Sequence, residues 1–316
     1  PTLTVTDNAS LYGGGADSCT LSNCTLTNNA AAYWGGGASF SALNLCTLSA
    51  NSVSAGGGGG AYWCTLTDCA VNGNWVQGGN GGGGAYYGTL YNCVVSGNHA
   101  SACSGGGAAS AELKNCLLTG NQAESGGGSY SCTLNNCTLS GNWASLDGGG
   151  DYSSRLTNCI VYYNNSYMLS GSNWSGSTAS YCCTFPLPGG AGNLTNAPVF
   201  VSLAGGNLRL LPGSPCINAG LNAAAPGPVD LDGNTRIVSG TVDLGAYEWT
   251  GRPQFVSLQR PGPSGMTLYL LGETGRVVDF YASSNLTQWF YLARRTNTIG
   301  QVVYTDSGAT NQPRRL

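Results

Sequence analysis

The sequence predicts an all-β protein in which a parallel β-solenoid, built from coils of about 22 residues, precedes a small β-sandwich. Three observations predict this architecture. Motifs such as "NCTLSGN" recur seven times at nearly constant spacing, apolar residues alternate at period two within each copy, and the composition changes after about residue 250. Glycine supplies 51 of the 316 residues in clusters, which indicates recurrent turns rather than a flexible linker.

A cysteine marks each copy of the repeat, at steps of 21 to 24 residues along the chain. An aliphatic residue follows each cysteine after two positions, a leucine precedes it by three, and a glycine triplet ends nine positions before it. If coils stack at about 4.8 Å, these columns become ladders, and the apolar ones fill the interior. The cysteines are Cys24, Cys46, Cys69, Cys93, Cys116, Cys137 and Cys159.

An asparagine follows each of these cysteines by five residues. Stacked amide side chains can bond to one another and to the turn backbone, which satisfies the polar groups of a buried turn. We therefore predict a structural ladder rather than a binding site at this column. Its members are Asn29, Asn51, Asn74, Asn98, Asn121, Asn142 and Asn164.

The first residues of the chain follow the same columns, because Leu3, Val5 and Asn8 fit the cysteine, aliphatic and asparagine positions. The chain is therefore expected to begin partway through a coil. An open coil edge predicts a cover, either a preceding segment or a neighbouring subunit. The start lacks a basic stretch and an apolar stretch, so we expect a removed leader or a fragment.

The columns blur beyond Asn164, and "SYCCTF" at 180–185 reads as one more, degenerate coil. We predict two domains. The first is a β-helix over 1–250, with regular coils to about residue 165 and degenerate coils and a cap over 166–250. The second is a small β-sandwich over 251–316, where the sequence pattern predicts strands separated by short turns.

Several motifs resemble known bacterial surface proteins. The order "PVFV", "NLRLLPGSPCINAG", "DLDGN" and "VDLGAYE" resembles the C-terminal part of right-handed parallel β-helix proteins of the choice-of-anchor Q type. "GGGA" and "LSGN" in the repeats resemble polymorphic-membrane-protein repeats, although Leu stands where that family has Phe. "ASSNLTQW" is similar to the appended verrucomicrobial-type β-sandwich. The resemblance implies a right-handed β-helix at the cell surface or outside the cell, and no particular chemistry.

Composition excludes several classes of function. Charged residues are 8% of the chain, the net charge is -3, and Lys114 is the single lysine. The sequence therefore lacks the basic residues that a nucleic-acid-binding face needs. No apolar run approaches the ~20 residues of a membrane span. No Cys-x-x-Cys pair exists and His99 is the single histidine, so a zinc site is not expected.

The chain contains 14 cysteines. Side-by-side Cβ vectors would strain a disulfide between parallel neighbours, so we predict that the periodic cysteines are free buried thiols. Off the ladder, a disulfide between Cys216 and either Cys182 or Cys183 is the better candidate.

Alternating carboxylates before Gly233 suggest a calcium site. Asp230 and Asp232, completed by Asp243 and Glu248, could form a loose oxygen cage, although the spacing does not match an EF-hand. The alternative is that these acids pair with Arg236 and cap the solenoid. Apart from calcium, no cofactor is expected.

Aromatic residues follow the glycine triplets at Tyr62, Tyr86, Tyr130 and Tyr152, with Trp63 and Tyr87 beside them. If they face outward, they form a stacking platform for sugar rings or a partner protein, and if they face inward they pack a corner. The sequence leaves both orientations open.

The sequence therefore predicts an extracellular structural or adhesive surface protein that self-associates end to end, with surface glycans as the other expected partner. No catalytic residue is assigned. The alternative is a carbohydrate-binding or polysaccharide-processing β-helix, for which Asp147, Asp151 and Arg155, with Glu124 one coil earlier, are the acidic cluster to inspect.

Overall fold

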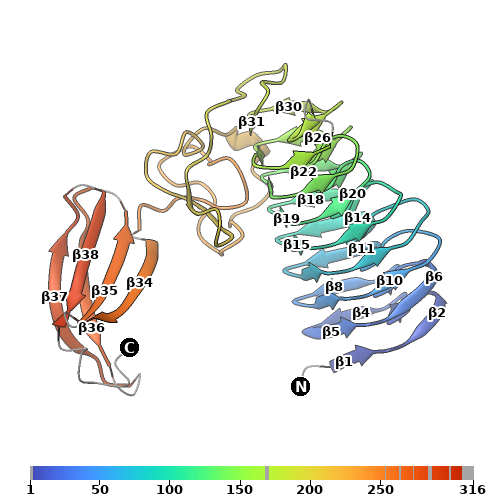
Figure 1. Cartoon of the computed structure of the whole chain (residues 1–316), viewed down its shortest axis with the longest axis horizontal. Coiled ribbons are helices and arrows are strands. Elements are labelled where there is room, and N and C mark those ends of the chain that lie inside the picture. Colours follow the sequence, from blue (N-terminus) through green and yellow to red (C-terminus); the bar gives the residue numbers. More distant parts are fainter. Residues whose placement is uncertain are drawn as a thin grey trace. The chain divides into compact units, whose positions relative to one another are not determined.

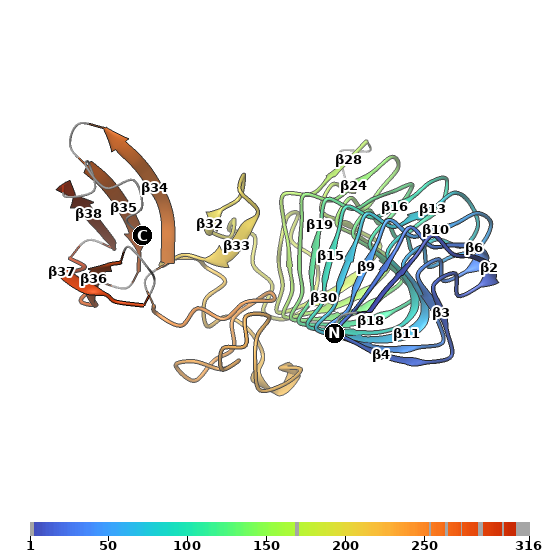
Figure 2. The same cartoon turned by 90° about the horizontal axis from the view of Figure 1, so that it is seen from below.

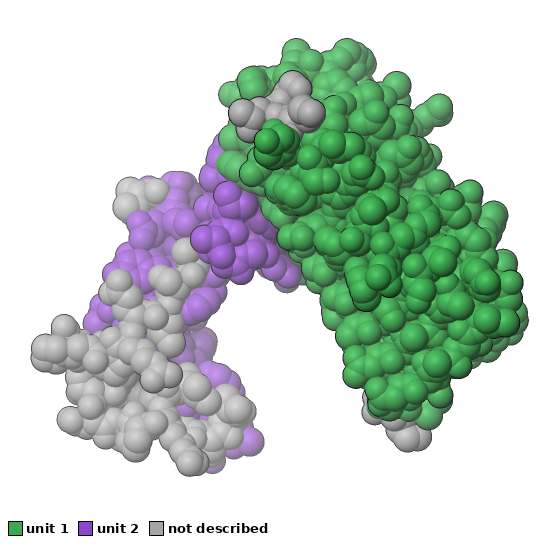
Figure 3. All heavy atoms as spheres, turned by 45° about the vertical axis from the view of Figure 1, so that its right-hand side comes forward, with its two compact units in different colours: residues 1–198, 215–248 green, residues 199–214, 249–316 purple. Residues whose placement is uncertain are grey.

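The computed structural model describes residues 3–167, 171–252, 254–262, 265–272, 274–283, 287–298 and 300–307. The chain forms two compact units (Figure 3). The first consists of Pro1–Pro198 and Pro215–Glu248, and the second of Val199–Ser214 and Trp249–Leu316. The sequence placed the boundary at 250/251, and it did not separate the segment 199–214 from the solenoid.

The first unit is a parallel β-helix, which confirms the predicted fold class. Three sheets run along it, and neighbouring coils contribute neighbouring strands (Figures 1 and 2). Sheet A has nine strands and begins at the cysteine position of each coil. They are β1 (Leu3–Thr6), β5 (Cys24–Thr27), β9 (Thr47–Ser49), β12 (Ala70–Asn72), β15 (Val94–Ser96), β19 (Leu117–Thr119), β23 (Thr138–Ser140), β27 (Ile160–Val161) and β31 (Cys183–Thr184).

Sheet B has eight strands and follows the asparagine column. They are β2 (Ala9–Tyr12), β6 (Ala30–Trp34), β10 (Ser52–Val53), β13 (Trp75–Val76), β16 (His99–Ala100), β20 (Gln122–Ala123), β24 (Trp143–Ala144) and β28 (Asn165–Ser166).

Sheet C has fourteen strands and follows the glycine corner. Most coils contribute two short strands to it, and two coils contribute one long strand each, β11 (Ala61–Thr67) and β14 (Ala85–Tyr91). The others are β3 (Ala16–Asp17), β4 (Thr20–Ser22), β7 (Ala38–Ser39), β8 (Ala42–Asn44), β17 (Ala108–Ala109), β18 (Glu112–Lys114), β21 (Ser129–Tyr130), β22 (Thr133–Asn135), β25 (Asp151–Tyr152), β26 (Arg155–Thr157), β29 (Trp174–Ser175) and β30 (Thr178–Ser180).

The strands form because their apolar residues alternate and stack in register. In sheet C, Leu43 pairs with Leu66, Leu66 with Leu90, and Leu90 with Leu113. These side chains are buried in one apolar cluster with the cysteine column. Each buried leucine contributes roughly 1.5–3 kcal/mol relative to an exposed one, so the repeated column stabilises the stack. The first coil follows the predicted register, because Leu3 pairs with Cys24 and Val5 with Leu26.

Stacked amides connect the coils at the turn between sheets A and B. The Nδ2 atom of Asn98 donates to Asn121 Oδ1 at 3.0 Å and to the Val71 carbonyl at 2.9 Å. The Asn98 backbone N–H donates to the same Asn121 oxygen at 3.0 Å. This pattern repeats along the predicted asparagine column, and Asn8 and Asn173 extend it at the two ends. The buried turn is thereby supplied with hydrogen bonds.

Residues with positive φ bend each coil, and they also form columns. One column lies directly before the cysteines, and in four consecutive coils it is asparagine, a residue that tolerates the left-handed region. Its members and φ values are Asn23 (54°), Leu45 (53°), Asp68 (51°), Asn92 (53°), Asn115 (52°), Asn136 (49°), Asn158 (54°) and Tyr181 (51°).

Part of this corner is covered by the lateral segment, our name for Pro215–Glu248, whose helical element is the short 3₁₀ turn η2 (Asn222–Ala224). Asn115 Nδ2 donates to the Val229 carbonyl at 2.7 Å, Asn136 Nδ2 to the Asp243 carbonyl at 3.1 Å, and Asn158 Nδ2 to the Leu221 carbonyl at 3.0 Å. The sequence predicted a cap here, but these contacts place the segment along the side of three coils. It buries outward positions of sheet A, namely Leu117, Thr138 and Ile160.

The second unit contains the hairpin β32 (Phe200–Ser202) and β33 (Asn207–Leu210). It also contains a three-stranded antiparallel sheet of β34 (Gln254–Gly262), β35 (Gly265–Leu271) and β38 (Gln301–Asp306), and the pair β36 (Val277–Ala282) and β37 (Phe290–Thr296). Residues 284–286 of the "ASSNLTQW" motif lie outside the described residues. No helix among the residues that the structure describes is long and apolar enough to cross a membrane.

The asparagine column gives a stability prediction. Replacing Asn98 by Ala removes both side-chain donor bonds and leaves the Asn74 amides, which donate to Asn98 Oδ1 at 2.9 Å, without their acceptor. We expect the free energy of unfolding to fall by about 2–4 kcal/mol, because buried groups lose their partners. The urea midpoint measures this change. The exposed Asn80→Ala serves as control and should shift stability by less than about 0.5 kcal/mol; equal effects of the two substitutions would contradict the ladder's role.

Candidate functional site

Three aromatic residues, two exposed and one half-buried, occupy one bend of three consecutive coils, and they form the candidate site. We call Phe40, Trp63 and Tyr87 the aromatic column. Their φ angles are 47°, 50° and 57°, in the left-handed region that bulky side chains rarely adopt. Phe40 is 55% exposed and Trp63 52% exposed, and Tyr87 is half-buried. The equivalent positions of the other coils hold small residues, which are Ser18, Ser110, Ser131, Ser153 and Gly176.

The column is supported by rings from the neighbouring positions. Trp63 stacks on Tyr87 with ring centroids 5.0 Å apart and an interplanar angle of 25°. Tyr87 contacts Tyr86 at 4.3 Å and Tyr62 at 6.3 Å, and Phe40 meets Tyr62 edge-on at 5.4 Å. Because each ring rests against another, the outer rings are held as a rigid apolar surface.

The four tyrosines predicted as ligand-binding fall into two groups. Tyr62 and Tyr86 lie half-buried beneath the aromatic column, where Trp34 stacks on Tyr62 at 4.7 Å. Burial raises the pKa of the Tyr86 hydroxyl. Tyr130 and Tyr152 stack in parallel on each other at 5.5 Å, two and three coils further along. Ala109 occupies the coil between the two groups in the sheet register.

Sequence reasoning noted Trp63 and Tyr87 as companions of the tyrosines, and it missed Phe40. The signal was available in the repeat. Aligned on the cysteine, Phe40 stands six residues before Cys46, as Trp63 stands before Cys69 and Tyr87 before Cys93. The small residues at this position of the other coils mark it as a bend.

A groove of about 390 Å³ adjoins the column. Trp63 and Tyr87 line one end of it. Gly88 and Ala111 also line it, and the remaining described lining comes from hydroxyl-bearing residues and one acid. These are Thr89, Ser110, Glu112, Ser131 and Thr133. The site therefore combines an apolar stacking surface with a row of hydrogen-bonding groups.

Two of the acids predicted as a calcium site accept hydrogen bonds from backbone N–H groups of the lateral segment. Asp230 accepts hydrogen bonds from the backbone N–H groups of Asn234 at 2.7 Å and Glu248 at 2.8 Å. Glu248 accepts from the N–H groups of Val238 at 2.9 Å and Asp243 at 3.0 Å. Asp232 is exposed. Among the residues that the structure describes, no three His, Cys, Asp or Glu side chains are grouped to hold a metal ion, and the calcium site stays a prediction.

Arg236 lies buried among these acids. Its Nη2 atom donates to the carbonyl oxygens of Asp243 at 3.1 Å and Gly245 at 2.5 Å. Burial lowers the pKa of the guanidinium, and the charges of Glu248, Asp230 and Asp243 oppose that shift. Burial and the nearby Asp243 raise the pKa of Glu248 to about 7. Arg236 therefore donates to backbone carbonyls within the lateral segment, and the pairing of these acids with Arg236 in a cap of the solenoid stays a prediction.

Two acids of the cluster considered for catalysis accept hydrogen bonds from serine hydroxyls. Asp151 is fully buried at an interior position, where Ser129 Oγ donates at 2.5 Å and Ser177 Oγ at 2.6 Å. Asp147 accepts from Ser175 Oγ at 2.7 Å and from the Gly148 N–H at 3.0 Å. The two acids therefore do not converge on an open groove, as a hydrolytic acid pair must.

No disulfide joins any of the fourteen cysteines, which all lie among the described residues and include Cys182, Cys183 and Cys216. The predicted disulfide to Cys216 is therefore absent from the structure. The cysteine ladder extends one coil further than the sequence analysis placed it, because the Cys159 N–H donates to Cys182 Sγ at 3.4 Å. Burial raises the pKa of Cys64 and of Cys132 to about 12. Such thiols are poor nucleophiles and act as apolar filling.

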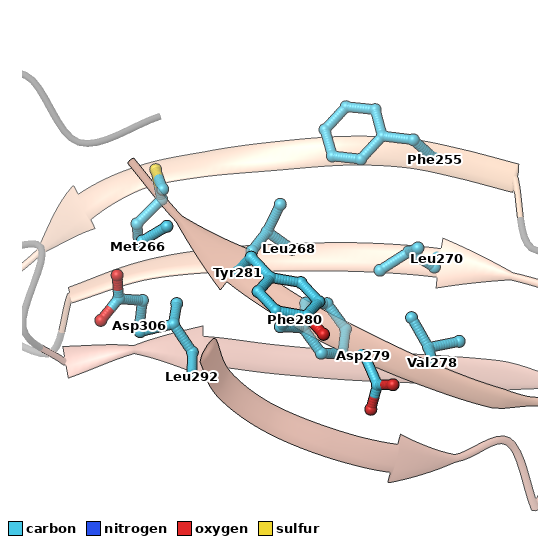
Figure 4. A pocket seen from close by; sticks show the side chains of 11 residues that line it. Phe255, Met266, Leu268, Leu270, Val278, Asp279, Phe280, Tyr281, Leu292 and Asp306 are labelled. Atoms are coloured by element: carbon cyan, nitrogen blue, oxygen red, sulfur yellow. The ribbon is translucent and has the colours of Figure 1, made fainter. Parts of the chain in front are cut away.

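The second unit contains a separate apolar cavity of about 250 Å³ (Figure 4). Leu268 and Leu270 of β35 face Val278 and Phe280 of β36 across it, and Phe255 of β34 lies at its rim. Asp279 at its edge pairs with Arg294 through two contacts of 2.6 and 2.7 Å. The lining is that of the interior between two sheets, and it offers no hydrogen-bonding row like that of the groove.

Comparisons with known proteins give no family for this chain. No family model matches the chain, and no curated protein matches it. Among solved structures the chain is similar to pectate lyase Pel9A, with 15% sequence identity and a TM-score of 0.43, over 78% of this chain and 72% of that one. At this level of similarity, the likeness says nothing about what the chain binds.

The buried Asp151 gives a pH prediction. Burial raises its pKa from 3.8 to about 6, so the folded state binds a proton more tightly than the unfolded state. Stability should therefore be highest in acid and fall by up to about 3 kcal/mol as the pH rises from about 4 to about 6. Glu248 contributes in the same direction up to about pH 7. Urea unfolding at several pH values should show a shallower fall for Asp151→Asn, whereas the exposed Asp68→Asn should follow the unmodified chain. An unchanged slope in Asp151→Asn would contradict this assignment.

Proposed function

We propose that this chain is an extracellular, adhesive surface protein that binds a glycan on its aromatic column. The single observation that carries the proposal is the placement of Phe40, Trp63 and Tyr87 at a strained, exposed bend. An unfavourable backbone conformation costs on the order of 1–3 kcal/mol per residue, and bulky side chains fit it worse than the serines found elsewhere in this column. Three aromatic residues at this bend oppose stability, which favours a role in binding.

The chemistry of the column suits a sugar ring. A pyranose presents an apolar face of C–H groups and an equatorial rim of hydroxyls. Trp63 and Tyr87 offer a flat apolar surface on which the apolar face of the sugar can stack. The hydroxyl-bearing side chains of the groove lie next to this surface. An aromatic ring with one wet edge is the side-chain type that proteins use for such half-apolar surfaces.

The extracellular location is supported by the motifs, and the buried position of the thiols is compatible with it. The interior cysteines lie in parallel columns, where disulfides are strained, so an oxidising environment leaves the fold intact. The choice-of-anchor Q and polymorphic-membrane-protein resemblances, and the appended sandwich of verrucomicrobial type, belong to the same proposal of a bacterial surface protein.

Self-association is the second role that we propose, because coils that stack in register within one chain can also stack between two chains. Leu3, Leu11 and Tyr12 belong to β1 and β2, the terminal strands of sheets A and B. A second copy that stacks on the first coil would continue both sheets and bury these side chains. Sedimentation velocity at increasing concentration should then show a growing species, and a monomer at all concentrations would contradict the role.

The polysaccharide-processing alternative has less support. Hydrolysis uses two carboxyl groups on either side of the scissile bond. Glu112 is the one acid among the described residues that line the groove, and it pairs with Lys114 at 2.8 Å.

The proposal is tested by replacing Trp63 with Ser, the residue that four other coils carry at this bend. Binding on a glycan array, followed by titration of the best ligand, should weaken by at least about tenfold, because an aromatic anchor typically contributes 2 kcal/mol or more. The matched control is Trp143→Ser in β24, which removes a tryptophan that is 38% exposed on sheet B. Loss of affinity in both variants, or in neither, would contradict the assigned site.

A further inference from the structure

The groove beside the aromatic column crosses the strands instead of following one of them. Its described lining comes from four successive coils at equivalent positions, beginning at Trp63 and Tyr87 and continuing through Ser110 to Ser131. Three inter-coil steps of about 4.8 Å span roughly 14 Å, so the groove has the length of an oligosaccharide rather than of a single ring. Its direction is the axis of the solenoid.

The side chains change along this path. The bend position is aromatic at Trp63 and Tyr87, and it becomes Ser110 and Ser131 in the next two coils. The groove is therefore lined by rings in its first two coils and by smaller side chains at the bend of the next two. A chain that stacks one sugar on Trp63 can therefore continue over the serines, where Thr89 and Thr133 offer hydroxyls to its rim.

The charge of the groove selects among polysaccharides. The described residues that line it include no Lys, Arg or His, and they include one acid, Glu112. The nearby Lys114 is paired with Glu112 at 2.8 Å. A polyuronate carries a carboxylate on every sugar and needs cations to neutralise it, and this lining supplies none. An uncharged chain meets no such cost.

We propose that an extended, uncharged polysaccharide lies in this groove with its chain along the solenoid axis, stacked on Trp63 and Tyr87 and reaching as far as Ser131 within the groove. This inference rests on the proposed function and adds the class of the ligand, its direction and its length. In this proposal, the small side chains of Ser110 and Ser131 leave room for the polysaccharide.

The test places a ring in that space. Ser131→Trp puts a tryptophan at the bend where Trp63 already stands three coils earlier, with φ 51° at Ser131 and 50° at Trp63. The matched control is Ser153→Trp, which makes the same change one coil further along, at φ 60° and outside the described lining. The probes are β-1,4-linked gluco-, manno- and xylo-oligosaccharides from disaccharide to hexasaccharide, with galacturonate oligomers as the anionic series.

We expect the affinity of the unmodified chain to rise with length in one of the neutral series and to stay unmeasurable for the galacturonates. Ser131→Trp should lower hexasaccharide affinity by about tenfold, to near that of the disaccharide, a change of about 1.4 kcal/mol. Ser153→Trp should bind as the unmodified chain does. Urea midpoints confirm that both variants fold.

Each other outcome overturns a distinct statement. Equal behaviour of Ser131→Trp and Ser153→Trp, with binding still lost in Trp63→Ser, overturns the axial path and leaves the proposed function standing. Tight galacturonate binding overturns the uncharged class. If the unmodified chain binds no glycan, in the array or among these probes, the proposed function itself fails.

Discussion

The parallel register between coils is the constraint on which the rest of this structure depends. Each strand of the solenoid pairs with the equivalent strand of the coils before and after it, so a residue type is stacked on its counterpart about 22 residues away. Every column must therefore be a side chain that tolerates its own copy at about 4.8 Å. Leucine and cysteine satisfy this condition by packing, and asparagine satisfies it by accepting from one copy and donating to the next.

The same constraint makes departures from a column informative. A small residue fits a bend with positive φ best, and four of the eight coils have serine there. Where Phe40, Trp63 and Tyr87 replace it, the chain accepts exposed rings at positive φ, and the rings stabilise one another by stacking. The regular spacing of these rings follows from the parallel register between coils. The solenoid thus sets both the distance between binding groups and the direction of the groove.

Much of the fold could be predicted because periodic columns report directly on stacking. The cysteine, leucine and asparagine columns each correspond to a ladder in the structure, and Leu3 and Val5 follow them. The orientation of the aromatic residues could not be predicted, because it depends on which residue of each coil takes positive φ. The bend could have been found by comparing the same position in different coils, for example Phe40 with Ser18 and Ser110.

The course of the lateral segment could not be predicted from the sequence, and the reason is physical. It has few regular elements, so no periodicity marks it, and its acids suggested a cap or a metal site. The better signal lay in the coils that it covers. The outward position after the cysteine is Thr25 and Thr47 in early coils and becomes Leu117 and Ile160 later, which are buried. Apolar residues at an outward position predict a cover on that side.

The most direct test of this account is a crystal structure of the chain with a neutral hexasaccharide bound. The account predicts electron density for a sugar stacked on Trp63 and for a chain that crosses successive coils over Ser110 towards Ser131. Density that follows a single strand, or that lies on the Tyr130–Tyr152 pair with the Trp63 ring bare, would contradict it.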